Sequence, residues 1–132
     1  MSQENVEVAR QALDAFSRRD VDAMRALNHP DMELDWSASH GFQAGVYRGF
    51  DAALRFWAEY FEAFQEIVFE PISFIDAGES VVVPNVARQR GRDGIEVSAR
   101  SALVYTVRSR RITRICLYQE TEEALKAVGL EE

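Results

Sequence analysis

The first 36 residues constrain the fold of this chain more than any other stretch. Apolar residues recur every three or four positions over residues 3–18, which predicts a helix that buries one face. Asp20 can cap a second, short helix, and Pro30 ends it because the residue before a proline avoids helical geometry. Residues 32–36 then alternate apolar and acidic side chains, which predicts a strand with one buried face.

The rest of the chain adds one more helix and then changes its period. A loop over residues 37–47 precedes a third helix from Asp51 to about Phe64, whose wide aromatic face is typical of packing against a sheet. From Ile67 onward the apolar residues recur every second position, as in strands. We expect strands at about 66–76, 80–90, 95–107 and 112–120, joined by short turns, and a last short helix from Thr121.

This order of elements predicts a single α+β domain over residues 1–132, with the helices on one face of a sheet. Pro71 and Pro84 fall inside the β half, where a proline cannot donate a ladder hydrogen bond and marks a bulge or an edge. Bulges bend a sheet, and a sheet bent around helices encloses an apolar cone. The mouth of such a cone is a natural place for a pocket.

Composition restricts the classes of partner. The net charge of −7 argues against nucleic acids and anionic membranes, because both need clustered cations. No apolar run reaches the roughly 20 residues that span a bilayer. The single cysteine, Cys116, excludes an internal disulfide, and the N-terminus lacks a signal-peptide pattern, so we expect a cytoplasmic protein. Two histidines and one cysteine provide no metal-binding spacing, and phosphate- and dinucleotide-binding glycine motifs are missing, so we expect no metal and no cofactor.

Positive charge is nevertheless concentrated late in the chain. Eight arginines lie between residues 88 and 114, against two acidic residues. We interpret them as charged strand edges and hairpin tips, which oppose edge-to-edge pairing of sheets. The alternative is an anion-binding patch or a dimer face.

Five segments stand in a recognisable order and spacing over nearly the whole chain, at residues 15–23, 30–36, 46–49, 74–78 and 117–120. In this they resemble nuclear transport factor 2-like proteins of the SnoaL-like branch. The resemblance implies a cone-shaped fold with a curved antiparallel or mixed sheet wrapped around three N-terminal helices. It selects no activity, because the superfamily includes isomerases, epoxide hydrolases, polyketide cyclases, dehydratases and non-catalytic adaptors.

The resemblance also locates catalytic positions, and this chain lacks the expected side chains there. The carboxylate base, the helix tyrosine and the second acid of the ketosteroid-isomerase type fall near Trp36, Ala12 and Leu103. Asp35 is adjacent to Trp36 but points to the opposite face of its strand unless the register slips. The paired aspartates of the limonene-epoxide-hydrolase type and the aspartate–histidine pair of the polyketide-cyclase type are missing as well.

Strand register decides which polar residues face the pocket. A four-residue turn at 91–94 would pair Arg88 with Val97 and place Arg88 on the inner face near the mouth. A half-buried arginine needs an anionic partner, either a protein carboxylate or a ligand. On the last strand the apolar pattern places Gln119 inward and Tyr118 outward, and a shifted hairpin would reverse this.

These observations define the candidate site residues. His40 lies in the loop beside the expected mouth, and an imidazole can act as an acid or base near neutral pH. The catalytic candidates are His40, Arg88, Tyr105 and Asp35. The expected ligand-binding residues are Trp36, Tyr47, Trp57, Phe61, Arg88, Ser101, Leu103, Tyr105 and Gln119.

An aromatic, sparsely polar pocket suits a flat hydrophobic small molecule. The first hypothesis is therefore a small-molecule-binding protein, with a cyclase-, isomerase- or hydrolase-like activity left open. The second is a non-catalytic accessory domain that works as a homodimer through the outer sheet face. The third is an interaction scaffold that uses the arginine-rich strands. The expected outer-face residues are Ser98, Arg100, Ala102, Val104 and Thr106.

Overall fold

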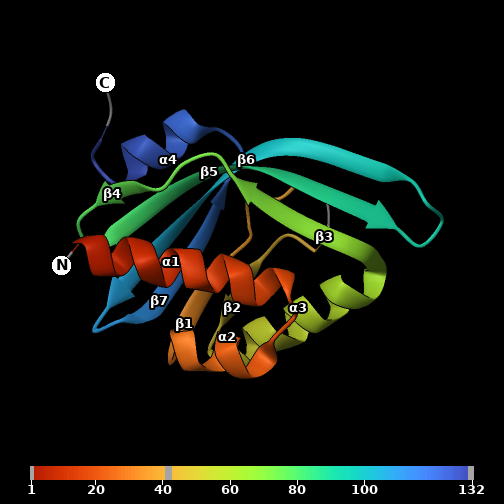
Figure 1. Ribbon diagram of the computed structural model, residues 1–132, viewed down its shortest axis with the longest axis horizontal. Helices are drawn as coiled ribbons and strands as arrows, with labels where there is room; N and C mark the ends of the chain where they lie inside the picture. Colours follow the sequence, from red (N-terminus) through yellow and green to blue (C-terminus); the bar gives the residue numbers. More distant parts are fainter. Residues whose placement is uncertain (1, 41–42, 131–132) are drawn as a thin grey trace.

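The computed structural model describes residues 2–40 and 43–130, so residues 41–42 of the predicted loop lie outside the described part. Along the described chain, two helices and two strands precede a third helix, and five further strands and a final helix follow it (Figure 1). The elements are α1 (Ser2–Ser17), α2 (Val21–Leu27), β1 (Asn28–Asp35), β2 (Val46–Arg48), α3 (Phe50–Ala63), β3 (Phe64–Pro71), β4 (Ile75–Ala77), β5 (Ser80–Gly91), β6 (Glu96–Arg108), β7 (Arg111–Tyr118) and α4 (Thr121–Ala127).

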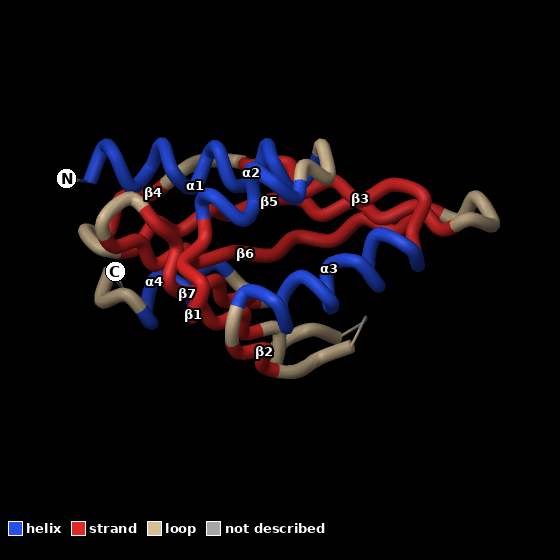
Figure 2. Tube along the Cα trace, turned by 90° about the horizontal axis from the view of Figure 1, so that it is seen from below, coloured by secondary structure: helices blue, strands red, loops and turns tan. Residues whose placement is uncertain are grey.

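The strands form one mixed sheet in the order β2-β1-β7-β6-β5-β3, and β4 also pairs with β5. Among the described strands, β1 and β7 alone run parallel, and the other pairs are antiparallel. The sheet curves without closing, and α3 lies between its two ends, near β1 and β2 on one side and β3 on the other (Figure 2). The predicted α+β class and the curved sheet around three N-terminal helices are confirmed.

The main core fills the hollow of this sheet. Leu13 of α1 and Trp57 of α3 pack with inward side chains of the central strands, such as Val83 and Leu103. A second, smaller cluster lies on the outer face, where Ala124 of α4 packs with buried residues of three strands. Part of the expected dimer face is therefore covered by the chain's own last helix. The covered outer-face residues are Val82, Ala102, Val104 and Cys116.

The short helix and the first strand meet without a loop. Asp20 caps α2 as predicted, because its Oδ1 accepts the backbone N–H of Ala23 at 3.1 Å. The strand then begins at Asn28 rather than at residue 32. Pro30 does not end the helix but lies in β1, where the pairing with β7 shifts between Asn28 and Glu33. A proline without an N–H fits at such an irregularity.

Two predicted segments divide differently from expectation. The strand expected over 66–76 is split into β3, which ends at Pro71, and β4, which begins at Ile75. The break follows the proline, which cannot donate to the ladder. A short β2 at 46–48 forms within the expected loop because it pairs with the exposed edge of β1.

The register of the β5–β6 hairpin differs by one residue from the predicted one. The backbone N–H of Gly91 donates to the carbonyl oxygen of Ile95 at 2.8 Å, so the turn has three residues instead of four. Gly94 makes this tight turn possible with a φ of +88°, which side chains rarely adopt. Arg88 therefore pairs with Ser98 instead of Val97. Because side chains alternate along a strand, this shift moves Arg88 from the inner to the outer face.

Candidate functional site

A cleft of ≈ 270 Å³ opens on the inner face of the sheet. It lies along the part of the β5–β6 hairpin that extends past the helices (Figure 1). Loop residues after β1, one residue of α3 and one of β3 form its walls, and the end of β7 closes one side. Arg100 and His40 are exposed and lie at its rim. The cleft is lined by Trp36, Ser39, His40, Tyr60, Phe69, Ala87, Gln89, Val97, Ala99, Arg100, Ser101, Leu117 and Gln119.

The cleft exists because its floor is made of small side chains. Ala87 of β5 is directly opposite Ala99 of β6, and both line the cleft. Phe69 of β3 pairs with Ala87 from the other side and stands as a wall. Two methyl groups fill far less space than the branched residues that occupy the same face nearer the core, so the floor stays open.

Uncharged polar groups border this apolar floor. The Gln89 amide Nε2 donates to the Tyr60 hydroxyl, and Gln119 Nε2 donates to the carbonyl oxygen of Ala38 at 2.7 Å. Ser101 Oγ donates to the buried Asn85 Oδ1 at 2.8 Å. Burial raises the pKa of Tyr60 above its ordinary value, so its hydroxyl keeps its proton at neutral pH. Gln89 and Gln119 both line the cleft, and each amide also carries an oxygen that can accept a hydrogen bond.

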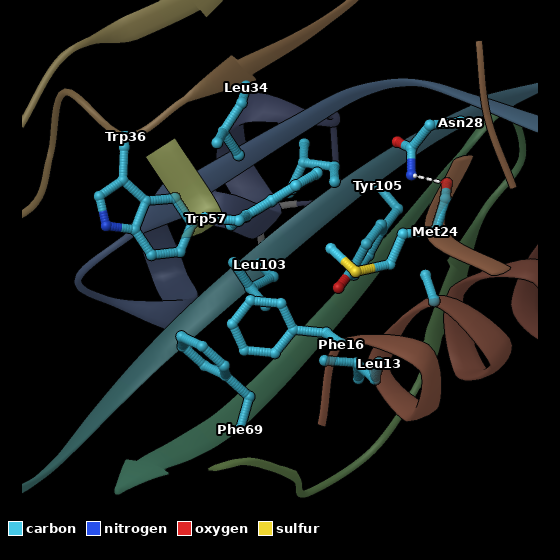
Figure 3. A pocket seen from close by; sticks show the side chains of 12 residues that line it. Leu13, Phe16, Met24, Asn28, Leu34, Trp36, Trp57, Phe69, Leu103 and Tyr105 are labelled. Atoms are coloured by element: carbon cyan, nitrogen blue, oxygen red, sulfur yellow. Dashed lines mark hydrogen bonds between the residues drawn. The ribbon is translucent and has the colours of Figure 1, made fainter. Parts of the chain in front are cut away.

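A second, smaller cavity of ≈ 30 Å³ lies deeper in the cone (Figure 3). Trp36 and Phe69 line both spaces, and their rings meet edge to face, with centroids 6.1 Å apart at 88°. These two side chains form the wall between the cleft and the inner cavity. The inner cavity is lined by Ala12, Leu13, Phe16, Met24, Asn28, Leu34, Trp36, Trp57, Phe69, Leu103, Tyr105 and Ile115.

The structure brings most of the predicted binding residues to one of these two spaces. Trp36, Ser101 and Gln119 line the cleft with His40 at its rim. Trp57, Leu103 and Tyr105 line the inner cavity together with Trp36. Gln119 faces inward as the predicted register required, and Tyr118 packs with the outer cluster.

Three predicted residues lie elsewhere. Tyr47 stacks on Phe56 with ring centroids 4.7 Å apart, and its hydroxyl donates to the Gln43 carbonyl oxygen, so it lines neither space. Phe61 lines neither space: it packs on the Phe16 ring with centroids 5.0 Å apart and lies beneath the Arg19 guanidinium. The inward placement of Arg88 was wrong: it lies on the outer face and forms an ion pair with Glu70 at 3.1 Å. The three-residue turn is the physical reason.

Most arginines of the arginine-rich stretch between residues 88 and 114 have a partner within the chain. Arg88 and Arg90 pair across strands with carboxylates of β3, and Arg92 donates to a backbone carbonyl of α3. Arg108, Arg110 and Arg114 form ion pairs with carboxylates of the turn before β5, of α1 and of β1, respectively. The carboxylate partners of these arginines are Glu70, Glu66, Glu79, Glu4, Glu33 and Asp35. Arginines that are paired with carboxylates of the same chain are typical of charged strand edges and hairpin tips, as the sequence indicated.

The family model described as SnoaL-like domain matches residues 9–115. The chain belongs to the SnoaL-like family. No curated protein sequence matches the chain. Among the residues described, no helix of this SnoaL-like domain is long and apolar enough to cross a bilayer.

Solved structures share the fold. A nuclear transport factor 2-like protein from Burkholderia xenovorans is 27% identical, covers 98% of both chains and has a TM-score of 0.78. TerC, co-crystallised with polyporic acid, is 21% identical over 95% of this chain and 98% of its own, with a TM-score of 0.76. A protein with a ketosteroid isomerase-like fold from Catenulispora acidiphila, in complex with trimethylamine, is 16% identical over 94% and 93%, with a TM-score of 0.75.

Asp35 points away from the pocket of this SnoaL-like domain. It forms an ion pair with Arg114 at 2.9 Å, and its Oδ1 accepts hydrogen bonds from Ser37. Its neighbour Trp36 points into the cone. The register slip that would have turned Asp35 inward does not occur. Asp35 is directly opposite Cys116 of β7, and residues opposite each other on neighbouring strands point to the same face, which for Cys116 is the outer face. Asp35 is therefore not placed to act as a base in the cleft.

The pKa of Asp35 lies below its ordinary value. Partial burial acts to raise it, but the Ser37 hydrogen bonds and the Arg114 charge together outweigh burial. A carboxylate with a lowered folded-state pKa stabilises the fold above its unfolded pKa, near 3.9 in a typical Asp. That stabilisation is lost as pH falls through the folded pKa.

Replacing Asp35 with asparagine is therefore expected to lower the free energy of unfolding by about 1 kcal/mol at pH 7, a value discounted for partial solvent exposure. The difference from the parent protein should shrink as pH falls below the unfolded-state pKa of about 3.9 and through the lower folded-state pKa, because protonation removes the same interactions in the parent. Urea unfolding at a series of pH values measures this. Asp31→Asn, an exposed change on the same strand, should stay near the parent throughout. A difference that stays constant with pH would contradict the linkage.

Some lining residues were not predicted from the sequence. Tyr60, Phe69, Ala87 and Gln89 line the cleft, and Asn28 lines the inner cavity. The signal that could have revealed the β5 residues is the Asp93–Gly94 dipeptide, which is typical of tight hairpin turns. Among the residues that the structure describes, no three His, Cys, Asp or Glu side chains gather where they could hold a metal ion.

Proposed function

We propose that this SnoaL-like domain binds a small, flat, largely apolar and uncharged molecule in the cleft. The supporting observation is the floor formed by Ala87 and Ala99 between the aromatic walls of Trp36, Tyr60 and Phe69. Amide and hydroxyl groups at its border can orient such a molecule by hydrogen bonds. None of the described residues lining the cleft is an aspartate or glutamate, so the lining disfavours a cationic ligand, and its one arginine, Arg100, is exposed at the rim rather than beside the apolar floor.

Two solved relatives support a small-molecule role. TerC was co-crystallised with polyporic acid, and the Catenulispora acidiphila protein is in complex with trimethylamine. Both share the cone-shaped fold in which the cleft of the present chain lies. They support binding of a small molecule as a use of this fold, and the lining of the present cleft supports the class of molecule.

Filling the floor tests this proposal. Ala99→Phe is expected to weaken binding of the neutral fluorescent probe N-phenyl-1-naphthylamine roughly tenfold or more, since overpacking costs about 1–3 kcal/mol and 1.4 kcal/mol is tenfold. Fluorescence titration of the probe measures the affinity. Ser98→Phe, the adjacent exposed residue on the other face of β6, is the matched control and should bind as the parent does. Equal effects of the two changes, or no binding by the parent, would overturn the proposal.

Catalysis in the same cleft is the second candidate function, and His40 is the observation that favours it. It is the only histidine that lines the described cleft, and an imidazole exchanges protons readily near neutral pH. Arg88 and Asp35 lie on the outer face, and burial raises the pKa of Tyr105, which keeps its hydroxyl neutral. A cyclase-, isomerase- or hydrolase-like turnover would then be lost in His40→Ala while binding of the neutral probe persists.

A homodimeric accessory role is the third candidate. The centre of the outer sheet face lies under α4, so a second copy would have to use the far part of the β5–β6 hairpin. Ile95 and Val97 are 65% and 57% exposed there, and β6 has no strand partner on its β7 side before Ala102 among the described residues. Light scattering decides between a particle of 15.0 kDa and one of twice that mass.

A further inference from the structure

The floor of the cleft ends at a serine whose proton is already in use. Ser101 lies two residues beyond Ala99 on the same face of β6, and both residues line the cleft. The Ser101 Oγ donates to Oδ1 of Asn85, the residue directly opposite on β5, at 2.8 Å. Ser101 is 8% exposed and Asn85 is 0% exposed, so the serine borders the cleft and the asparagine is enclosed by protein.

The direction of this hydrogen bond is fixed by the backbone. The Nδ2 of Asn85 donates to the carbonyl oxygen of Val83 at 2.9 Å. A carbonyl oxygen can only accept, so the amide nitrogen must face Val83 and the amide oxygen must face Ser101. The amide oxygen can only accept as well, so the single proton of the Ser101 hydroxyl is directed at Asn85. What Ser101 offers to any further group is therefore the lone pairs of its oxygen.

Satisfying the backbone does not account for Asn85. The backbone N–H of Val107 donates to the carbonyl oxygen of Glu79 at 2.8 Å, and hydrogen-bonded pairs recur at every second residue of an antiparallel ladder. Counted from this pair along the continuous β5–β6 register, Val83 and Leu103 form such a pair. The Val83 carbonyl oxygen thus already accepts a bond within the sheet. The specific effect of the buried Asn85 amide is to orient the hydroxyl opposite it.

The orientation of Ser101 determines which ligand groups it can bind. An O–H or an uncharged N–H of a ligand can donate to the Ser101 oxygen. A ligand oxygen or nitrogen without a hydrogen would lose its bond to water and meet an oxygen whose proton points elsewhere, which costs free energy. An ammonium group finds no carboxylate among the described residues that line the cleft. Ser101 therefore favours uncharged donors.

We propose that Asn85 is a positioning residue that holds Ser101 as a hydrogen-bond acceptor, so that the cleft selects flat apolar ligands carrying an uncharged O–H or N–H. This inference rests on the proposed function and names its ligand class. Ala99 and Ser101 are two residues apart on one strand, a separation of about 7 Å. A two-ring molecule that lies on the alanine floor can therefore bring a polar substituent at its edge to the serine.

The test compares three uncharged probes of similar shape: naphthalene, 2-naphthol and quinoline. Naphthalene has neither a donor nor an acceptor, 2-naphthol adds an O–H, and quinoline has a ring nitrogen that can only accept. Equilibrium dialysis at neutral pH measures the three affinities. We expect the parent protein to bind 2-naphthol about three- to tenfold more tightly than naphthalene, the range of one hydrogen bond, and quinoline no more tightly than naphthalene.

Two substitutions separate the roles of the two residues. Ser101→Ala should weaken binding of 2-naphthol about three- to tenfold and change that of naphthalene less than about twofold. Asn85→Leu frees the Ser101 proton, so quinoline should gain about three- to tenfold while 2-naphthol keeps its advantage. A merely structural role of Asn85 would shift the three affinities together. Ser101→Thr retains the hydroxyl and is the matched control, with the preferences of the parent.

Three results would overturn the inference. They are equal parental affinities for 2-naphthol and naphthalene, a preference for 2-naphthol that survives Ser101→Ala, and a quinoline affinity that Asn85→Leu does not raise. Ser101→Ala leaves the Asn85 oxygen without its donor and should lower the urea midpoint. If that variant does not fold, the double variant Ser101→Ala with Asn85→Leu removes both partners and should bind the three probes alike. A preference for 2-naphthol in the double variant would overturn the inference equally.

The failure of this inference and the failure of the cleft function give different results. Binding of N-phenyl-1-naphthylamine that is sensitive to Ala99→Phe, without a preference for 2-naphthol, would keep the cleft function and reject selection by Ser101. If neither N-phenyl-1-naphthylamine nor any of the three probes binds, the cleft function is rejected as well.

Discussion

Replacing Trp36 with alanine is expected to lower the free energy of unfolding by about 3–5 kcal/mol, the usual cost of removing a buried aromatic side chain. Trp36 is 5% exposed, and its ring contacts those of Phe56, Tyr60 and Phe69 at centroid distances of 5.7, 6.4 and 6.1 Å. No neighbouring side chain is free to fill the volume of an indole. Urea unfolding followed by circular dichroism measures the loss.

The same change should join the cleft to the inner cavity, because Trp36 is half of the wall between them. N-phenyl-1-naphthylamine should then bind more tightly than in the parent protein, since an apolar space opens without a new polar group. Trp36→Phe is the matched control: it keeps a ring in the wall and should lose less than half as much stability. A Trp36→Ala variant as stable as the parent protein would mean that the indole ring does not fill the space between the cleft and the inner cavity.

Replacing Phe56 with alanine is the second large change, with an expected loss of about 3–5 kcal/mol. Phe56 is 2% exposed on the buried face of α3, and its ring contacts those of Trp36, Tyr47 and Tyr60. It therefore joins α3 to β1 and β2 and holds the aromatic wall of the cleft. With a total stability of about 5–15 kcal/mol for a typical domain, the variant should unfold at a much lower urea concentration.

Phe61 provides the comparison within the same helix. It is half-buried, packs on Phe16 and under Arg19, and lines neither cavity itself. Phe61→Ala should therefore cost about 1–2 kcal/mol, as partial burial of an aromatic ring predicts. It should also leave probe binding unchanged, whereas Phe56→Ala should weaken it. Equal losses for the two variants would contradict the central position assigned to Phe56.

Much of the fold was predictable because local patterns specify local structure. Helical periodicity in residues 3–18 and the Asp20 cap indicated α1 and α2, and the period of two after Ile67 indicated the strands. The boundaries were less accurate where proline acts within a strand. Pro30 lies in β1 and Pro71 ends β3, since each removes a ladder donor without preventing extended backbone.

The site was predictable only in part. Trp36, Ser101 and Gln119 reach the cleft because alternation from a correctly assigned strand places them inward. Arg88 does not, because one residue fewer in the turn before Ile95 exchanges the faces of β5. Gln89 then takes the inner position and orients the Tyr60 hydroxyl. A charged residue was expected at a position where the structure has an amide.

The amino-acid sequence by itself determined the class of the fold, the order of its elements and the aromatic character of its interior, because periodicity and residue type act over a few neighbouring positions. Only the tertiary structure decided which side chains share a space. The opposed alanines of the cleft and the wall of Trp36 and Phe69 both depend on contacts between distant segments. Those contacts follow from a hairpin register set by one glycine at positive φ and from packing that no local pattern encodes.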